Sequence, residues 1–380
     1  MTLLQLLIRI INWLNIMGKI KLAIIGAHGL PAKYGGYCTL AEYLAEYKPE
    51  DFDVTVYCVA AEYDEHPSIY KGVHLEWINY SARGMMAWQF HKYGLAHAIS
   101  HGADCILLCG SNGGFILPFY HKYRERFFLN IGGIEWKRNK FNWFMQRVMR
   151  VLMKSAVRSC AYLVADNIGI HDYMREEYGR EDSVVIAYGG DQAKKIELTP
   201  DVIEKYPFVN GKYAVAIARI QSDNNVEMLL EAFKDATIPL VYIGNWNITP
   251  WAQQIREKFS KYRNLILLDA IYDIPVLNQI RSNCAIYVHG HSAGGTNPSL
   301  VEAMHVEVPL ACFDNGFNNN ATYNKALYFK DVEGLKQIVS ETRPEKFSEV
   351  AKNMKLLAME HYTWETITAQ YYEFFRNRKL

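Results

Sequence analysis

The chain has 380 residues, which is long for a single domain, and 50% of them are hydrophobic while 21% are charged. This composition predicts two domains with large cores and argues against global disorder. The net charge of +1 argues against a surface that coats nucleic acid at large.

Near the N-terminus, residues 3–16 are almost all apolar, and Leu4, Leu7 and Ile11 fall on one helical face. The run is too short to span a bilayer comfortably and lacks a signal-peptide cleavage site. Two interpretations of this segment remain: it forms an interfacial helix, or translation starts at Met17, just before the first strand.

Apolar runs then alternate with helix-like segments in two series. In the first series, strands are expected at 20–27, 53–60, 105–109, 126–131 and 162–165, with helices at 38–47 and 87–100. In the second, strands are expected at 213–218, 239–244, 264–269, 284–289 and 309–313, with helices at 224–235, 250–261, 273–282 and 298–305. Continuous apolar strands between helices predict parallel sheets covered on both faces, and thus an α/β chain of two Rossmann-like domains.

The loop after the first strand, residues 26–36, is rich in glycine and also contains His28. Its glycines lack the GxGxxG spacing, and the acidic partner expected after the second strand is absent, so a nicotinamide site is not expected. Gly35 and Gly36 could let the backbone approach a ligand, and a simple turn is the alternative.

A carboxylate, an aromatic ring and two cations follow the strand at 126–131, as Glu135, Trp136, Lys137 and Arg138. Rings stack on sugars and guanidinium groups bind phosphates, so this mixture suits a sugar or diphosphate acceptor. A helix start with an exposed Lys–Arg pair is the alternative.

Residues 136–165 contain no acidic residue and seven basic ones, at 137, 138, 140, 147, 150, 154 and 158. The spacings of Arg147, Arg150, Lys154 and Arg158 put these four on one helical face. A basic helix with aromatic residues suits an anionic membrane surface or a lipid diphosphate. The alternative is a solvated helix face packed on the core.

The cysteines are scattered and form no CxxC pair, and the twelve histidines show no HExxH spacing. The seven cysteines lie at 38, 58, 105, 109, 160, 284 and 312. A reducing cytoplasm therefore fits best, and neither a metal site nor another cofactor is expected. His289 and His291, which alternate at a strand end, are expected to pack rather than to bind a metal.

The most informative segment follows the strand at 284–289 and reads Gly294-Gly295-Thr296-Asn297-Pro298-Ser299-Leu300-Val301-Glu302-Ala303-Met304. Small residues let the backbone approach a ligand, and a helix start favours anions. Glu302, one turn into the helix, can accept hydrogen bonds from sugar hydroxyls. The segment therefore suits a ligand with both phosphate and sugar.

This segment closely resembles the sugar-nucleotide signature of retaining glycosyltransferases of family 4, and more narrowly of their rhamnosyltransferase-like subgroup. The loop at 26–36 and the string at 130–138 resemble the corresponding parts of the subgroup. Three departures stand out: Gly294 replaces the first of two glutamates, Asn224 replaces a lysine, and Gly132 replaces an aspartate.

The resemblance implies the GT-B architecture, in which two Rossmann-like domains face each other across a cleft. It implies an apolar extension at 1–18, an acceptor domain at 19–191, a sugar-nucleotide domain at 192–360 and a helix at 361–380 that crosses back to the first domain. The boundary coincides with a polar, proline-containing stretch within 191–211.

The roles that the resemblance implies fall into three groups. Arg219 and Asn224 are expected to stabilise the departing diphosphate, and Glu302 to hold the nucleotide ribose. The donor is expected to contact Gly35, Gly36, Ile271, Tyr272, Gly295, Thr296, Asn297, Pro298 and Ser299. The acceptor is expected to contact His28, Glu135, Trp136, Lys137 and Arg138.

The implied activity is transfer of a sugar, most specifically L-rhamnose from dTDP-rhamnose, to a polyprenyl-diphosphate-linked saccharide in surface polysaccharide synthesis. It would proceed with retention and without a metal, at the inner face of the cell membrane. Two alternatives stay open: a sugar-nucleotide epimerase of the same architecture, and a non-catalytic sugar-nucleotide-binding subunit of a polysaccharide assembly complex.

Overall fold

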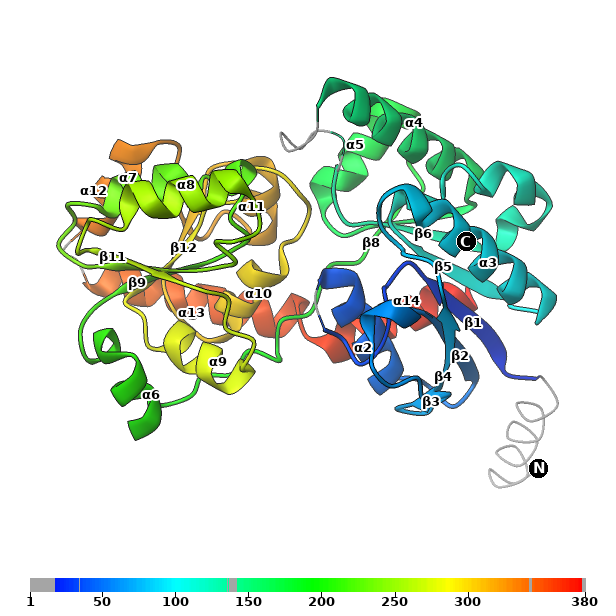
Figure 1. Cartoon of the computed structure of the whole chain (residues 1–380), viewed down its shortest axis with the longest axis horizontal. Helices are drawn as coiled ribbons and strands as arrows, with labels where there is room; N and C mark the ends of the chain where they lie inside the picture. The colour runs from blue at the N-terminus through cyan, green and yellow to red at the C-terminus, as the bar shows by residue number, and fades with distance from the viewer. Residues whose placement is uncertain (1–17, 34, 135, 137–141, 342–343, 378–380) are drawn as a thin grey trace, which may run out of the picture.

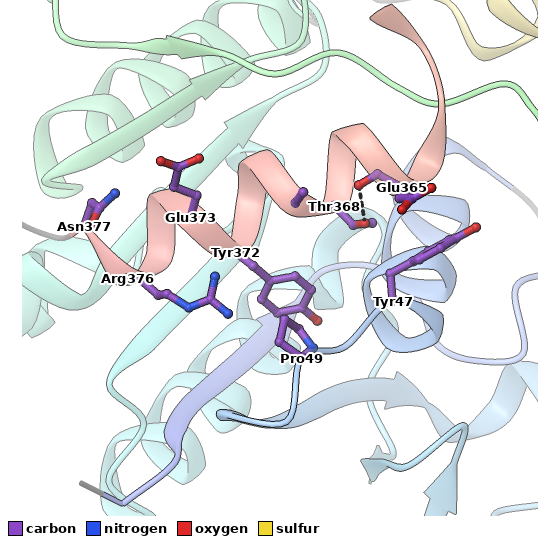
Figure 2. Close-up of a pocket in the computed structure, with 9 residues that line it drawn as sticks. Tyr47, Pro49, Glu365, Thr368, Tyr372, Glu373, Arg376 and Asn377 are labelled. Atoms are coloured by element: carbon purple, nitrogen blue, oxygen red, sulfur yellow. Dashed lines mark hydrogen bonds between the residues drawn. The ribbon is translucent and has the colours of Figure 1, made fainter. Parts of the chain in front are cut away.

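The computed structural model describes residues 18–33, 35–134, 136, 142–341 and 344–377. These residues form two α/β domains, each built on one sheet with helices packed on it (Figure 1). The α/β class predicted from the alternating strands and helices is confirmed.

Within the described residues, the first sheet has eight strands in the order β3-β4-β2-β1-β5-β6-β7-β8. Neighbouring strands are parallel except for β3 and β4. The strands are β1 (Ile20–Ile25), β2 (Phe52–Val59), β3 (Ile69–Tyr70), β4 (Val73–Ile78), β5 (Cys105–Cys109), β6 (Phe127–Ile131), β7 (Tyr162–Ala165) and β8 (Val184–Val185). The helices are α2 (Gly36–Glu46), α3 (Ala87–Ser100), α4 (Trp143–Ser159) and α5 (Ile168–Tyr178), with short 3-10 turns that include η1 (Ala60–Glu62), η3 (Ser111–Gly113) and η4 (Leu117–Arg126).

The second sheet, over the same described residues, has six strands in the order β11-β10-β9-β12-β13-β14, all parallel. They are β9 (Ala214–Ile217), β10 (Leu240–Ile243), β11 (Leu265–Leu268), β12 (Ile286–His289), β13 (Leu310–Phe313) and β14 (Leu327–Phe329). The helices are α6 (Pro200–Lys205), α7 (Val226–Phe233), α8 (Pro250–Phe259), α9 (Ile274–Ser282), α10 (Pro298–His305), α11 (Gly316–Ala321), α12 (Val332–Val339) and α13 (Pro344–His361).

The final helix, α14 (Trp364–Arg376), returns to the first domain. Its aromatic residues Tyr371, Tyr372 and Phe375 lie in the same buried core as Phe52 and Phe128 of the first sheet. Burial of several aromatic side chains, each of which removes 150–250 Å² or thereabouts from water, ties the end of the chain to the domain where it began.

None of the described helices is long and apolar enough to cross a membrane. The apolar run at 3–16 lies outside the described residues.

Candidate functional site

The donor signature connects a buried strand to a helix at the carboxyl end of the second sheet. β12 ends at His289, and α10 begins at Pro298. The side chain of Asn297 caps this helix, because its Oδ1 accepts from the Ser299 amide at 3.1 Å and from the Ser299 hydroxyl at 2.9 Å. Proline in the first turn is compatible with the missing amide there. Asn297 and Ser299 therefore shape the loop through their bonds to each other.

Two side chains that are distant from Glu302 in the sequence hold its carboxylate. Its Oε2 lies 2.7 Å from Nη2 of Arg281, which is in the last turn of α9. Its Oε1 accepts from Nε2 of Gln192 at 2.7 Å. The Arg281 side chain is only 3% exposed and that of Glu302 is 21% exposed. A carboxylate with one fixed donor on each oxygen keeps a fixed direction for its remaining lone pairs.

Gln192 also links this carboxylate to α14. Its Oε1 accepts from the indole Nε1 of Trp364 at 2.7 Å. The Trp364 ring stacks on Tyr43 of α2, with centroids 4.4 Å apart and planes 9° apart. A continuous chain of contacts therefore joins Glu302 to the first domain.

The loop of the signature also touches the first domain directly. A Cβ added at Gly295 would lie 1.7 Å from Oδ1 of Asp166, so only glycine fits there. The Thr296 hydroxyl donates to the backbone oxygen of Asp166 and accepts from Nδ2 of Asn167 at 3.3 Å. Nδ2 of Asn167, the N-cap of α5, also contacts the backbone oxygen of Phe317 at 3.2 Å.

The glycines at the start of α2 approach the same helix. A Cβ added at Gly36 would lie 3.5 Å from Pro298, whereas one at Gly35 would meet nothing within 4 Å. Gly35 has a φ of 104°, a backbone conformation that favours glycine. Gly36, Gly295, Thr296 and Pro298 are thus brought together where the two domains meet.

Arg219 and Asn224 lie together at the end of β9, but they have different environments. Arg219 is exposed, while Asn224 is buried and donates Nδ2 to the backbone oxygen of Arg219 at 2.6 Å. This hydrogen bond uses one of the two N–H groups of the Asn224 amide, so a contact between Asn224 and a donor diphosphate stays a prediction.

Ile271 and Tyr272 follow β11, which is separated from β12 in the sheet by β10 and β9. Tyr272 is 69% exposed. Because the strands are parallel, these residues lie at the same end of the sheet as Arg219 and the signature.

In the first domain, His28 is the centre of a polar cluster at the end of β1. Its Nδ1 lies 3.2 Å from Oε1 of Glu62, and its Nε2 accepts from Nε of Arg83 at 3.2 Å. Because Arg83 can only donate, Nε2 carries no proton and Nδ1 donates to Glu62. Burial and the nearby Arg83 charge lower the pKa of His28. Lys33 donates to the backbone oxygen of Glu62 at 2.7 Å.

The predicted acceptor string is only partly described. Trp136 donates Nε1 to the Tyr173 hydroxyl at 2.8 Å, and the Arg150 guanidinium lies 5.0 Å from its ring centroid. The ring is therefore partly covered by protein groups, which limits its use as a sugar platform. Glu135, Lys137 and Arg138 lie outside the described residues.

Gly132, which replaces an aspartate of the resembled subgroup, has a steric reason to be glycine. A Cβ there would lie 3.0 Å from the Tyr37 hydroxyl and 3.3 Å from the Tyr188 hydroxyl. The Gly132 amide donates to the same Tyr37 oxygen at 3.0 Å. Two tyrosine hydroxyls therefore occupy the space that a larger side chain would need.

His289 and His291 stack on each other, with centroids 4.3 Å apart and planes 14° apart. Burial lowers the pKa of His289 to about 3, so it is neutral near pH 7. Among the described residues, no cluster of three or more His, Cys, Asp or Glu side chains could hold a metal ion.

Sequence reasoning missed Arg281 and Asp166 as parts of this site. Arg281 is a charged residue at the end of an otherwise neutral helix, and it has no spacing relationship to Glu302. Asp166 follows a strand in the other domain. Their positions depend on how separate elements pack, which no local pattern reports.

Comparison with known proteins agrees with this architecture. A family model described as a domain of unknown function, DUF1972, matches residues 19–191. No curated protein matches the chain in sequence.

Solved structures resemble nearly the whole chain. Sucrose-phosphate synthase from Thermosynechococcus elongatus has a TM-score of 0.78 at 14% identity, over 94% of this chain and 99% of that chain. Anabaena HepE in complex with UDP-glucose has a TM-score of 0.72 at 14% identity, over 94% and 100%. A glycosyltransferase from Rickettsia africae has a TM-score of 0.69 at 14% identity, over 95% and 98%. The chain therefore has the GT-B fold, with two Rossmann-like domains joined by a terminal helix that packs on the first.

Proposed function

We propose that this chain is a glycosyltransferase that uses a nucleotide-sugar donor. The observation that carries the proposal is the arrangement of Glu302, held by Arg281 and Gln192 at the carboxyl end of the second sheet. Ligands of open α/β sheets bind at this end of the strands. Anabaena HepE, a structural neighbour, was crystallised with UDP-glucose, which supports a nucleotide sugar as the donor.

The more specific proposal is a retaining transfer of L-rhamnose from dTDP-rhamnose to a polyprenyl-diphosphate-linked saccharide, without a metal ion. An oxygen of the acceptor forms a bond to the anomeric carbon as the bond from that carbon to the diphosphate breaks. The acceptor proton passes to the departing phosphate oxygen, so no side chain needs to act as nucleophile.

Two features of the second domain support stabilisation of the departing diphosphate. Arg219 is exposed at the end of β9, which pairs with β12. The loop before α10 brings backbone groups of small residues to the same edge of the sheet. A guanidinium fork and backbone amides are the groups that bind phosphate oxygens. Charge that develops on the diphosphate would be stabilised there.

The test combines the purified full-length chain with UDP-, GDP- and dTDP-sugars and a membrane extract as acceptor source. Acceptor-dependent release of nucleoside diphosphate, with the sugar recovered in the lipid fraction, is the expected result. Isomerised donor in the absence of acceptor would instead identify an epimerase. Donor binding without turnover in the presence of a competent acceptor would identify a non-catalytic binding subunit.

Glu302→Gln sharpens this test. Loss of a carboxylate hydrogen bond to a ligand hydroxyl should weaken nucleotide affinity roughly ten- to a hundredfold, which corresponds to about 1.5–3 kcal/mol. Glu333→Gln, at an exposed carboxylate in α12, is the matched control. Unchanged donor affinity in folded Glu302→Gln protein, measured by calorimetry, would refute the assignment of Glu302 to the ribose.

A further inference from the structure

The outer face of α4 combines exposed apolar side chains with cations. Trp143 is 72% exposed, and Phe144 and Val151 are also exposed. Arg147, Lys154 and Arg158 are exposed on the same helix. Leu152, Met153, Ala156 and Val157, on the opposite side, are buried in the core. A helix face that merely contacts water has no need of an exposed tryptophan and phenylalanine side by side.

A second element packs against α4 and carries further exposed aromatic side chains. The loop between η3 and η4 contacts α4, because the Ser155 hydroxyl donates to the Gly114 backbone oxygen at 2.6 Å. A Cβ at Gly114 would lie 2.2 Å from the backbone oxygen of Leu152. This loop presents Phe115, and the start of η4 presents Phe119, which is 81% exposed. Figure 1 shows α4 along the outside of the first domain.

The charges of this face have one sign. No ion pair joins Arg147, Lys154 or Arg158 to a carboxylate in the described part of the chain. Arg150, expected on the same face, instead pairs with Glu177 of α5 and lies over the Trp136 ring. Residues 142–165 contain no acidic side chain. The uncompensated positive charge is therefore concentrated on three residues rather than four.

We propose that α4 and the η3–η4 loop form a docking surface for an anionic phospholipid bilayer. Aromatic side chains such as Trp143, Phe144 and Phe119 are favoured in the interfacial layer of a bilayer, where a ring can enter the apolar region. Arg147, Lys154 and Arg158 lie beside them, where long cationic side chains reach phosphate headgroups. Stable binding needs two such contributions together, and this surface supplies both.

This surface goes beyond the transfer reaction, and its binding can be measured without any substrate. It would hold the first domain against the bilayer that carries a lipid-linked acceptor. A failure of vesicle binding would therefore leave the nucleotide-sugar proposal intact, and the reverse also holds.

The first experiment measures partition of the full-length chain between buffer and vesicles. Vesicles of phosphatidylcholine alone are compared with vesicles containing phosphatidylglycerol. Changing Arg147, Lys154 and Arg158 together to glutamine should weaken binding to anionic vesicles roughly a hundredfold, since each cation contributes about a fivefold factor. The matched control changes Lys261, Lys330 and Lys352, three exposed cations of the second domain, to glutamine and should alter binding less than threefold.

The second experiment locates the contact and separates it from any effect of the apolar N-terminus. All seven native cysteines are buried, so a single exposed cysteine can be labelled selectively with an environment-sensitive dye. Dye at Val151→Cys should shift to the blue when anionic vesicles are added, whereas dye at Leu356→Cys, at a 67% exposed position on α13, should not.

Three outcomes would overturn the proposal. The dye at residue 151 could stay unchanged although the protein sediments with vesicles, which would place the contact elsewhere. The two triple variants could lose vesicle binding equally, which would show that binding depends on the net charge of the protein and not on this surface. A blue shift of the dye at residue 151 when RNA or an acidic protein is added, but not when vesicles are added, would assign the surface to a different class of partner.

Discussion

The two domains hold their candidate site residues in different ways, although both place them at the carboxyl ends of parallel strands. In the second domain, Glu302 is fixed by Arg281 and Gln192, and Asn297 caps the helix that carries Glu302. In the first domain, the cations Lys33 and Arg83 are exposed. Both lie in loops, where Lys33 donates to the backbone oxygen of Glu62 and Arg83 donates to His28.

This difference suits two kinds of ligand. Groups that are fixed before a ligand arrives lose little entropy on binding, so they favour one defined molecule such as a nucleotide. Long, exposed cationic side chains can adapt to a larger and more variable acceptor at an entropic cost. The comparison predicts that substitutions in the second domain cause larger and more specific losses than equivalent ones in the first.

The largest effect is expected from Arg281→Met. The change removes the cation that pairs with the Glu302 carboxylate. This carboxylate is only 21% exposed, so its charge is left unpaired and mostly buried. The free energy of unfolding should fall by about 3 kcal/mol. Adding Glu302→Gln removes the unpaired charge and should restore most of that loss. The midpoint of urea unfolding for the two variants measures both effects.

The equivalent change in the first domain is the control for the comparison. Glu62→Gln removes the carboxylate beside His28, and the Glu62 side chain is 37% exposed. The expected loss is below about 1 kcal/mol, because water screens such a pair. Similar losses for Arg281→Met and Glu62→Gln would remove the distinction between a fixed and an adaptable site.

Arg219→Lys is expected to lower kcat by roughly ten- to a thousandfold. Lysine keeps the charge but offers one point charge instead of a planar fork, and the diphosphate gains charge as the glycosidic bond breaks. Steady-state kinetics with saturating acceptor measure the effect, with Arg263→Lys, at another exposed arginine of the same domain, as the control. A kcat near that of the unmodified chain would mean that Lys33, from the first domain, carries the charge instead.

Gly295→Ala tests the contact between the domains. The added methyl group would overlap Oδ1 of Asp166, so the loop or the first domain must move. A stability loss of about 1–3 kcal/mol is expected, together with weaker donor binding. Gly316→Ala, where an added Cβ meets nothing within 4 Å, should change neither. Equal melting temperatures for the two variants would show that the domains do not need this contact.

Sequence reasoning predicted the fold well because the strands of both sheets are continuous apolar runs. It missed β4, in which His74 and Glu76 interrupt the apolar residues, and β3, β8 and β14, which have two or three residues each. Short or half-exposed strands have weak patterns.

The site was predictable where its chemistry is local. The position of Glu302 one turn into α10 follows from a strand, a loop and a helix start that are adjacent in sequence. The cation that holds Glu302 comes from another helix, and the amide of Asn224 donates to the Arg219 backbone oxygen. Both depend on packing and hydrogen-bond competition, which residue type and spacing do not encode.

The last prediction concerns pH and the buried His289 at the end of β12. Its pKa is lowered by burial to about 3 in the folded chain, whereas an unfolded histidine has a pKa near 6.5. Between these values the unfolded chain binds a proton that the folded chain excludes. His289 therefore does not lower the free energy of unfolding above about pH 6.5. Below that pH, the free energy of unfolding falls by about 1.4 kcal/mol for each pH unit, until the folded chain also binds the proton near pH 3.

His289→Phe removes this titration while keeping a ring to stack on His291. Urea unfolding at pH 7.0 and 5.5 should show a smaller acid loss for the variant than for the unmodified chain, by about 1.4 kcal/mol. Burial also lowers the pKa of His91 in the first domain, so His91→Phe should reduce the acid loss in the same direction. If His289→Phe and the unmodified chain lose the same stability between pH 7.0 and 5.5, His289 takes up its proton in the folded state. The end of β12 beside the signature would then admit water.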